Sequence, residues 1–186
     1  MILNAKNGSL AIGLTRMDYV HFGQGREALI IIPGLSDGIR TVKGMAGALA
    51  MMYRKFARHY RVYLISRKVD LPDPYPIEAM ADDYKSALDE LQLKTAHILG
   101  VSQGGMIAQW LAIKYPEMVS KLILTVTVAR PNETVNTVVS NWIARAQEDD
   151  FKQIVIDTAE RSYSPERLKR YRRLYPIVTK IGNPRI

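Results

Sequence analysis

The sequence contains no cysteine among its 186 residues, and this absence excludes three kinds of chemistry. Disulfide bonds, thiolate metal sites and a cysteine nucleophile all require a thiol. Long apolar runs are missing too, since no stretch approaches the roughly 18 residues that cross a bilayer. The first residues, MILNAKNGSL, lack the basic, apolar and small-residue regions of a signal peptide. We therefore expect a cytoplasmic protein with no membrane association, and no metal or organic cofactor is implied.

Acidic residues are scarce near the end of the chain, and this scarcity explains most of the net charge of +8. Residues 161–186 hold eight lysines and arginines against one acid, Glu166, so this segment carries +7. A basic run of this kind is most often a solvated helix face. No nucleic-acid-binding motif accompanies it, so we expect no nucleic-acid partner.

Strand-like and helix-like stretches alternate along the first 130 residues. Residues 15–23 and 28–34 are rich in apolar and β-branched residues and are joined by the turn signal GQG, which predicts a hairpin. The rest of the pattern predicts the following elements in order: a helix at 41–58, a strand at 62–66, a helix from Ile77 to Leu91, a strand at 96–101, a helix at 106–115 and a buried strand at 121–129. Such alternation predicts an α/β fold with a mostly parallel sheet covered on both faces.

The character of the sequence changes after Arg130 and Pro131. No strand-like run follows, and six apolar residues at helical spacing predict one helix face: Val135, Val138, Val139, Trp142, Ile143 and Ala146. Two further helices are predicted near 151–161 and 165–175. We therefore predict two parts, an α/β core at 1–130 and an all-helical region at 131–186.

The segment LGVSQGGM, residues 99–106, matches the pattern G-x-S-x-G around Ser102. In a nucleophile elbow the serine occupies a strained turn between a strand and a helix, so Gly100 and Gly104 must be small enough for the backbones to pass closely. The motif alone is common. Here an apolar strand precedes it and a helix follows it, which is the context that the elbow requires.

With this motif in place, residues 1–130 resemble the sheet half of the α/β-hydrolase family. The pieces IIIPGLSDG, VYLISRK and HILGVSQGGMIAQWLAIKYPEMVSKLIL stand in the order of that family. The resemblance implies that the loop Pro33-Gly34-Leu35 follows the third strand and that the Leu35 N–H group forms half of an oxyanion hole. The N–H group of Gln103, at a helix N-terminus, is the implied second donor. The candidate catalytic residues are therefore Ser102, Gln103 and Leu35.

The family resemblance also bears on the helical region and on the substrate. A helical cap is inserted between the sixth and seventh strands of the family, and residues 131–186 fit this description, with Trp142 as a candidate pocket residue. Members that open epoxides or displace halide carry aspartate where Ser102 stands. A serine there implies acyl transfer to water from a small-molecule ester, thioester, amide or peptide, cleavage of some carbon–carbon bonds, or perhydrolysis.

The sequence lacks a histidine after Ser102, where the family order places the general base. His97 lies five residues earlier on the same predicted strand, about 16 Å away. His59 and His21 are predicted at the edge of the sheet opposite the serine, so none of the three is a credible base. Glu133 is interpreted as an acid that suits a helix start rather than a catalytic carboxylate.

Two classes of function follow from this missing base. The first is a serine hydrolase that lacks its C-terminal part, with little or no turnover from these 186 residues. The second is a non-catalytic ligand-binding protein that retains the hydrolase fold. An incomplete sheet leaves an open edge and an exposed apolar face, which favours association with further copies of the chain.

Overall fold

The computed structural model describes residues 4–38 and 41–172. It divides into two compact units, Met1–Ala129 and Arg130–Ile186, and each is described by itself. The first unit contains every strand found in the described residues, and the second contains helices only.

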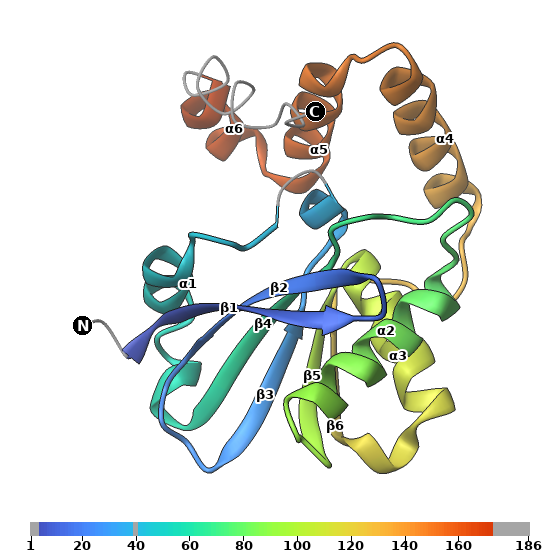
Figure 1. Ribbon diagram of the computed structural model, residues 1–186. Coiled ribbons are helices and arrows are strands. Elements are labelled where there is room, and N and C mark those ends of the chain that lie inside the picture. Colours follow the sequence, from blue (N-terminus) through green and yellow to red (C-terminus); the bar gives the residue numbers. More distant parts are fainter. Residues whose placement is uncertain (1–3, 39–40, 173–186) are drawn as a thin grey trace. The chain divides into compact units, whose positions relative to one another are not determined.

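The first unit is built on a mixed sheet of six strands in the order β1-β2-β4-β3-β5-β6 (Figure 1). The strands are β1 (Lys6–Ile12), β2 (Thr15–Phe22), β3 (Glu27–Ile32), β4 (Tyr60–Lys68), β5 (Ala96–Val101) and β6 (Val119–Thr125). β3, β4, β5 and β6 run parallel, whereas β2 is antiparallel to both β1 and β4. The predicted fold class, an α/β fold with a mostly parallel sheet, is confirmed.

The predicted hairpin between residues 15–23 and 28–34 is wrong. β2 forms its hairpin with β1, a strand that the sequence reasoning missed, through a turn at Gly13 and Leu14. β4 lies between β2 and β3. The GQG segment instead crosses the start of β4, where a Cβ atom on Gly25 would lie 2.5 Å from the Tyr60 Cα atom. Its glycines therefore allow a close backbone crossing rather than a hairpin turn.

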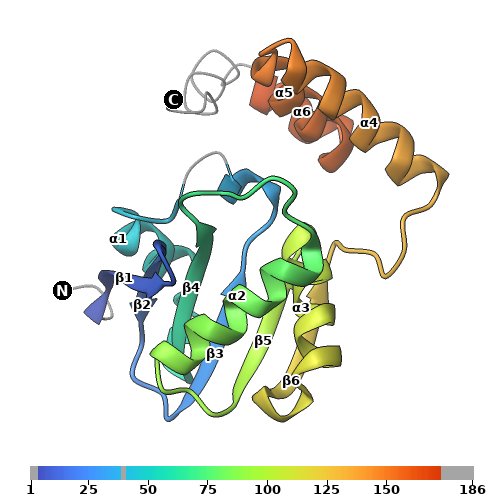
Figure 2. The ribbon, with the colours of Figure 1, turned by 45° about the vertical axis from the view of Figure 1, so that its right-hand side comes forward.

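Helices pack on both faces of the sheet, and the side chains of each strand alternate between the two faces. Ile30 and Ile32 of β3 belong to the core beneath α2 (Ile77–Glu90) and α3 (Gln103–Lys114). Leu29 and Ile31 belong to the core beneath α1 (Ala46–Met52). Figure 2 shows α1 on one side of the sheet and α2 and α3 on the other.

The helix predicted after β3 is shorter in the structure and is divided in two. The helix expected at 41–58 is α1 (Ala46–Met52) followed by the short 3-10 helix η3 (Phe56–Arg58). Ala46, Leu49 and Ala50 supply its buried face, so packing rather than the length of the helical pattern sets its extent. Another 3-10 helix, η2 (Leu35–Gly38), begins three residues after β3.

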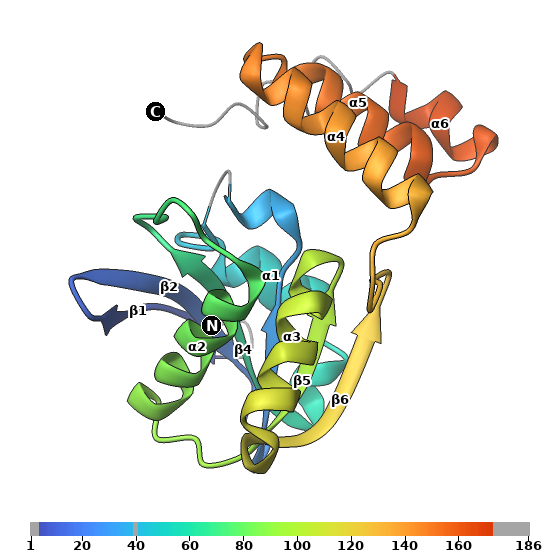
Figure 3. The ribbon, with the colours of Figure 1, turned by 90° about the vertical axis from the view of Figure 1, so that its right-hand side faces the viewer.

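The strand predicted as buried at 121–129 is an exposed edge strand. β6 pairs with β5 on one side, and within the described residues no strand pairs with its other side (Figure 3). Leu122, Ile123 and Leu124 are 38%, 39% and 42% exposed. The apolar β6 sequence is therefore typical of a central strand, but its place in the described sheet is an edge.

The second unit contains α4 (Glu133–Gln147), α5 (Phe151–Ser162) and α6 (Pro165–Tyr171). Glu133 is the first residue of α4, and the side chain of Asn132 caps this helix by accepting from the Val135 N–H group at 2.9 Å. Of the helix predicted at 165–175, the structure describes α6, and residues 173–175 lie outside the described residues. Among the helices that the structure describes in either unit, none is long and apolar enough to cross a membrane.

Candidate active site

Ser102 occupies the tight turn between β5 and α3. Its backbone has φ 55° and ψ −121°, a left-handed conformation that costs energy in any residue other than glycine. The turn is held because the Ser102 N–H group donates to the Thr125 carbonyl of β6 at 3.0 Å. The serine is exposed, so its hydroxyl group is accessible from solvent.

The glycines around Ser102 are required by close backbone contacts. A Cβ atom at Gly100 would lie 2.5 Å from the Gly105 Cα atom, and one at Gly104 would lie 2.5 Å from the Pro33 carbonyl oxygen. Neither neighbour is a flexible side chain that could move away. The elbow geometry that the G-x-S-x-G motif predicts is therefore present in the structure.

The loop after β3 lies directly beside the serine. A Cβ atom built on Gly34 would be 3.3 Å from the Ser102 Cβ atom and 3.8 Å from its Oγ atom. Leu35 is the first residue of η2, and Gln103 is the first residue of α3. The first N–H groups of a helix have no partner within that helix, so both residues suit the donation of a hydrogen bond to an anion.

Arg67, at the carboxyl end of β4, joins this site although the sequence reasoning missed it. Its Nη2 atom donates to the Gly34 carbonyl at 3.0 Å and to the Gln103 Oε1 atom at 2.5 Å. Its Nη1 atom lies 3.3 Å from Asp37 Oδ2. The one available signal was a charged residue at the carboxyl end of an apolar strand, the edge where α/β folds bind ligands.

The three histidines lie away from Ser102. His97 is the second residue of β5, and its Nε2 atom is 3.5 Å from Glu27 Oε1 at the amino end of the parallel strands. His59 directly precedes β4. His21 is not at the far edge as predicted: it lies in register with Tyr63, in the middle of β4, and stacks on that ring. It remains three strands from β5.

Burial and positive neighbours also make His21 a poor candidate for proton chemistry at this site. Desolvation lowers its pKa, and the charges of Lys6 and Arg61 lower it further. His21 and His97 thus belong to strands of the sheet and His59 precedes one, and none of the three has a described contact with Ser102.

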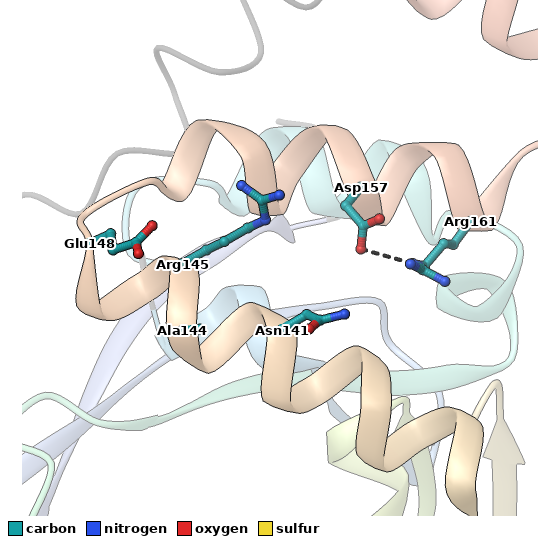
Figure 4. Close-up of a pocket in the computed structure, with 6 residues that line it drawn as sticks. All are labelled: Asn141, Ala144, Arg145, Glu148, Asp157 and Arg161. Atoms are coloured by element: carbon teal, nitrogen blue, oxygen red, sulfur yellow. Dashed lines mark hydrogen bonds and ion pairs between the residues drawn. The ribbon is translucent and has the colours of Figure 1, made fainter.

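A separate hollow lies between α4 and α5 in the helical unit (Figure 4). It is lined by Asn141, Ala144, Arg145, Glu148, Asp157 and Arg161. Arg161 pairs with Asp157 at 2.8 Å, and Arg145 pairs with Asp150 at 3.0 Å. Both arginines are thus already neutralised by local carboxylates. Across residues 4–38 and 41–172, no group of three or more His, Asp or Glu residues is placed to hold a metal ion.

Asp157 connects α5 to α4, because it accepts a hydrogen bond from Trp142 Nε1 at 2.7 Å. The side chain of Arg161, and then that of Trp142, lower the pKa of Asp157. A carboxylate with a lowered pKa stabilises the folded state at neutral pH, and this contribution is lost as the pH falls through the lowered pKa. Asp157→Asn is expected to destabilise the helical unit by about 1 kcal/mol and to remove this acid sensitivity.

The measurement is the fluorescence of Trp142 during an acid titration, made in a Trp110→Phe background so that one tryptophan reports. Glu148→Gln is the matched control, because Glu148 lines the same hollow without contacting Trp142 in the described contacts. An unchanged acid transition in Asp157→Asn would contradict the assignment.

The family model described as the alpha/beta hydrolase fold matches residues 27–171. The 3-oxoadipate enol-lactonase 2 of Acinetobacter baylyi is 36% identical over 95 residues, which cover 50% of this chain and 34% of that protein. The 2-hydroxy-6-oxononadienedioate/2-hydroxy-6-oxononatrienedioate hydrolase of a Pseudomonas species is 41% identical over 108 residues, covering 55% and 37%.

The solved structures give the same picture of the fold. The crystal structure of a hydrolase from Pseudomonas aeruginosa PA01 has a TM-score of 0.74 and 22% identity, and the match covers 95% of this chain and 66% of that one. At this identity the likeness concerns the fold alone. The sequence matches to the A. baylyi and Pseudomonas enzymes cover about a third of the length of each of those two curated relatives.

Proposed function

Because this chain belongs to the alpha/beta hydrolase fold family, we propose that it is a serine hydrolase acting on an ester, thioester or related acyl substrate through Ser102. The observation that carries the proposal is the exposed serine at φ 55°, placed beside Gly34 and at the start of α3. The name of the A. baylyi relative denotes a lactonase, and a lactone is a cyclic ester. That name supports the ester class.

The reaction would proceed by acyl transfer. Ser102 Oγ bonds to the acyl carbon while a base takes the hydroxyl proton, and the carbonyl oxygen becomes an oxyanion that accepts from the Leu35 and Gln103 N–H groups. The C–O or C–S bond to the leaving group then breaks, and the leaving group takes up a proton. Water repeats the attack on the acyl-serine, releases the acid and restores the hydroxyl group.

The base in this scheme is none of the three histidines, since none of them has a described contact with Ser102. We therefore expect the 186-residue polypeptide to turn over esters slowly or not at all. The proposal also assigns residues 131–186 to a helical cap, since they follow the last strand of the core and contain only helices in the described part.

The test supplies the base from solution. The 186-residue protein is incubated with p-nitrophenyl acetate and imidazole, and acetylation is followed by intact mass and peptide mapping. We expect the imidazole-dependent acetylation of the peptide that contains position 102 to be at least about 10-fold greater in the wild type than in Ser102→Ala, because a positioned serine and oxyanion hole favour the acyl transfer.

Equal labelling of the wild type and Ser102→Ala would contradict the proposal. Binding of acyl compounds without any acetylation would favour a non-catalytic ligand-binding protein. Rapid hydrolysis without imidazole, abolished in Ser102→Ala, would instead show that a base is present within these residues.

A further inference from the structure

Arg67 is a charged residue in the interior of the first unit. It is 3% exposed, and its partner Asp37 is 7% exposed. Asp37 accepts from the Ser66 hydroxyl at 2.6 Å and from the Arg67 backbone N–H group at 2.8 Å. Both oxygens of the Asp37 carboxylate accept hydrogen bonds, and one of them also pairs with Arg67 Nη1 at 3.3 Å. The other terminal nitrogen, Nη2, can therefore make other contacts.

Those other contacts all lie on the two segments that flank Ser102. Nη2 donates to the carbonyls of Pro33 and Gly34, at 3.4 and 3.0 Å, and to Gln103 Oε1 at 2.5 Å. One nitrogen therefore connects the loop after β3 with the first residue of α3. These segments are about 70 positions apart in the sequence.

Stability alone does not account for a buried ion pair at this place. Removing two charges from water is costly, and apolar residues of similar volume often stabilise a protein equally well or better. Burial raises the pKa of Asp37, whereas the hydrogen bonds from Ser66 and Arg67 act to lower it, so the carboxylate itself bears a desolvation cost. A planar guanidinium, unlike an apolar side chain, can hold several acceptors in fixed directions.

The contact with Gly34 has a direct geometric consequence. A peptide group is planar and trans, so the carbonyl of Gly34 and the N–H group of Leu35 belong to one rigid plane and point in opposite directions. The Gly34 oxygen accepts from Arg67 Nη2 at 3.0 Å and from the Asp37 backbone N–H group at 3.2 Å, so Arg67 and its partner Asp37 together set the direction of the Leu35 N–H group. Arg67 also holds the side chain of Gln103, the residue that supplies the second N–H group.

We propose that Arg67, anchored by Asp37, is a positioning residue that sets both donors of the oxyanion hole before a substrate arrives. This inference rests on the proposed function, because the direction of these N–H groups matters only if an oxyanion forms at Ser102. Arg67 acts through the backbone of Leu35 and Gln103.

The test separates positioning from stability with two variants. The double variant Arg67→Met/Asp37→Leu removes both charges together, so it is expected to keep a wild-type unfolding temperature. Arg67→Lys keeps a positive charge near Asp37, but its one nitrogen replaces the two guanidinium nitrogens that separately hold Asp37 and the Gly34–Gln103 pair, so it cannot keep both sets of contacts in their directions. In both variants the imidazole-dependent acetylation of Ser102 is expected to fall to the background level of Ser102→Ala, because the loss of one oxyanion donor costs about 100-fold.

Tyr84→Phe is the matched control. Tyr84 is fully buried and donates to the Ile65 carbonyl at 2.7 Å, two residues before Arg67 on the same strand. It has no described contact with Gly34 or Gln103, so its loss is expected to lower the unfolding temperature and leave the acetylation rate unchanged. Wild-type acetylation in a folded double variant or in Arg67→Lys would overturn the proposal.

A second readout keeps this proposal distinct from the proposed function. If the wild-type protein itself is not acetylated, the proposed function fails, and the crystal structure of the double variant then decides the role of Arg67. A turned Gly34–Leu35 peptide plane would support positioning by Arg67. An unchanged plane would overturn it.

Discussion

Gly104→Ala is expected to lower the free energy of unfolding by about 3 kcal/mol and to displace the turn at Ser102. The added methyl group would lie 2.5 Å from the Pro33 carbonyl oxygen and well inside contact distance of the Ile32 carbonyl. Both obstacles are backbone atoms at the end of β3, a strand in the middle of the sheet. The first turn of α3 must therefore move away from the sheet, and Ser102 and Gln103 move with it.

Chemical denaturation followed by circular dichroism measures this effect. Gly47→Ala is the matched control, because Gly47 also lies in the first turn of a helix, α1, and has no atom within 4 Å of an added Cβ. It is expected to stabilise the protein by about 0.5–1 kcal/mol, since alanine favours the helix over glycine. Equal effects of the two substitutions would contradict the close contact at Gly104.

Asp37→Leu alone is expected to destabilise the protein by about 3–5 kcal/mol. It leaves Arg67 charged, 3% exposed and without its carboxylate, and an uncompensated buried charge is far more costly than a buried pair. Adding Arg67→Met in the same chain is expected to recover most of the loss. The recovery distinguishes an unpaired charge from a simple packing defect.

Asp89→Leu serves as the control for an ion pair in water. Asp89 pairs with Lys85 on the exposed face of α2, where both side chains are more than a third exposed, and such pairs contribute less than about 1 kcal/mol. A loss at Asp37 no larger than the loss at Asp89 would refute the buried-pair argument.

The pH dependence of Asp37 has a definite sign. Burial raises the pKa of Asp37, with opposing contributions from Ser66 and Arg67, so the folded protein holds this proton more tightly than the unfolded chain does. Its contribution to stability is present at low pH and is lost as the pH rises through the raised pKa. Asp37→Leu therefore removes this loss of stability, which begins above the ordinary carboxyl pKa, and denaturation measured across pH would show the change.

The turn at Ser102 could be predicted from the sequence because its determinants are local. The strand Ala96–Val101 and the helix from Gln103 follow from a short apolar run and its helical continuation, and the glycines at 100 and 104 mark the turn between them. Each feature depends on a few neighbouring residues. The helices after Arg130 were predictable for the same reason, since apolar spacing of this kind is a local signal.

The order of the strands was not predictable in this way. The GQG segment matches a hairpin turn as well as it matches a crossing, and only the packing of β4 against both β2 and β3 decides between them. Likewise, the apolar β6 sequence predicts a buried strand, while its exposure depends on which strands pair beside it. Strand pairing joins segments far apart in the chain, and local periodicity carries no information on it.

The sequence by itself therefore determined the local elements, the serine on its turn and the absence of a histidine after it. Only the tertiary structure decided that β4 stands between β2 and β3, and that Arg67 consequently reaches Gly34, Asp37 and Gln103. The physical reason is one of range. Backbone preferences and side-chain periodicity act over a few residues, whereas a buried charge finds its partners among segments that the sheet brings together.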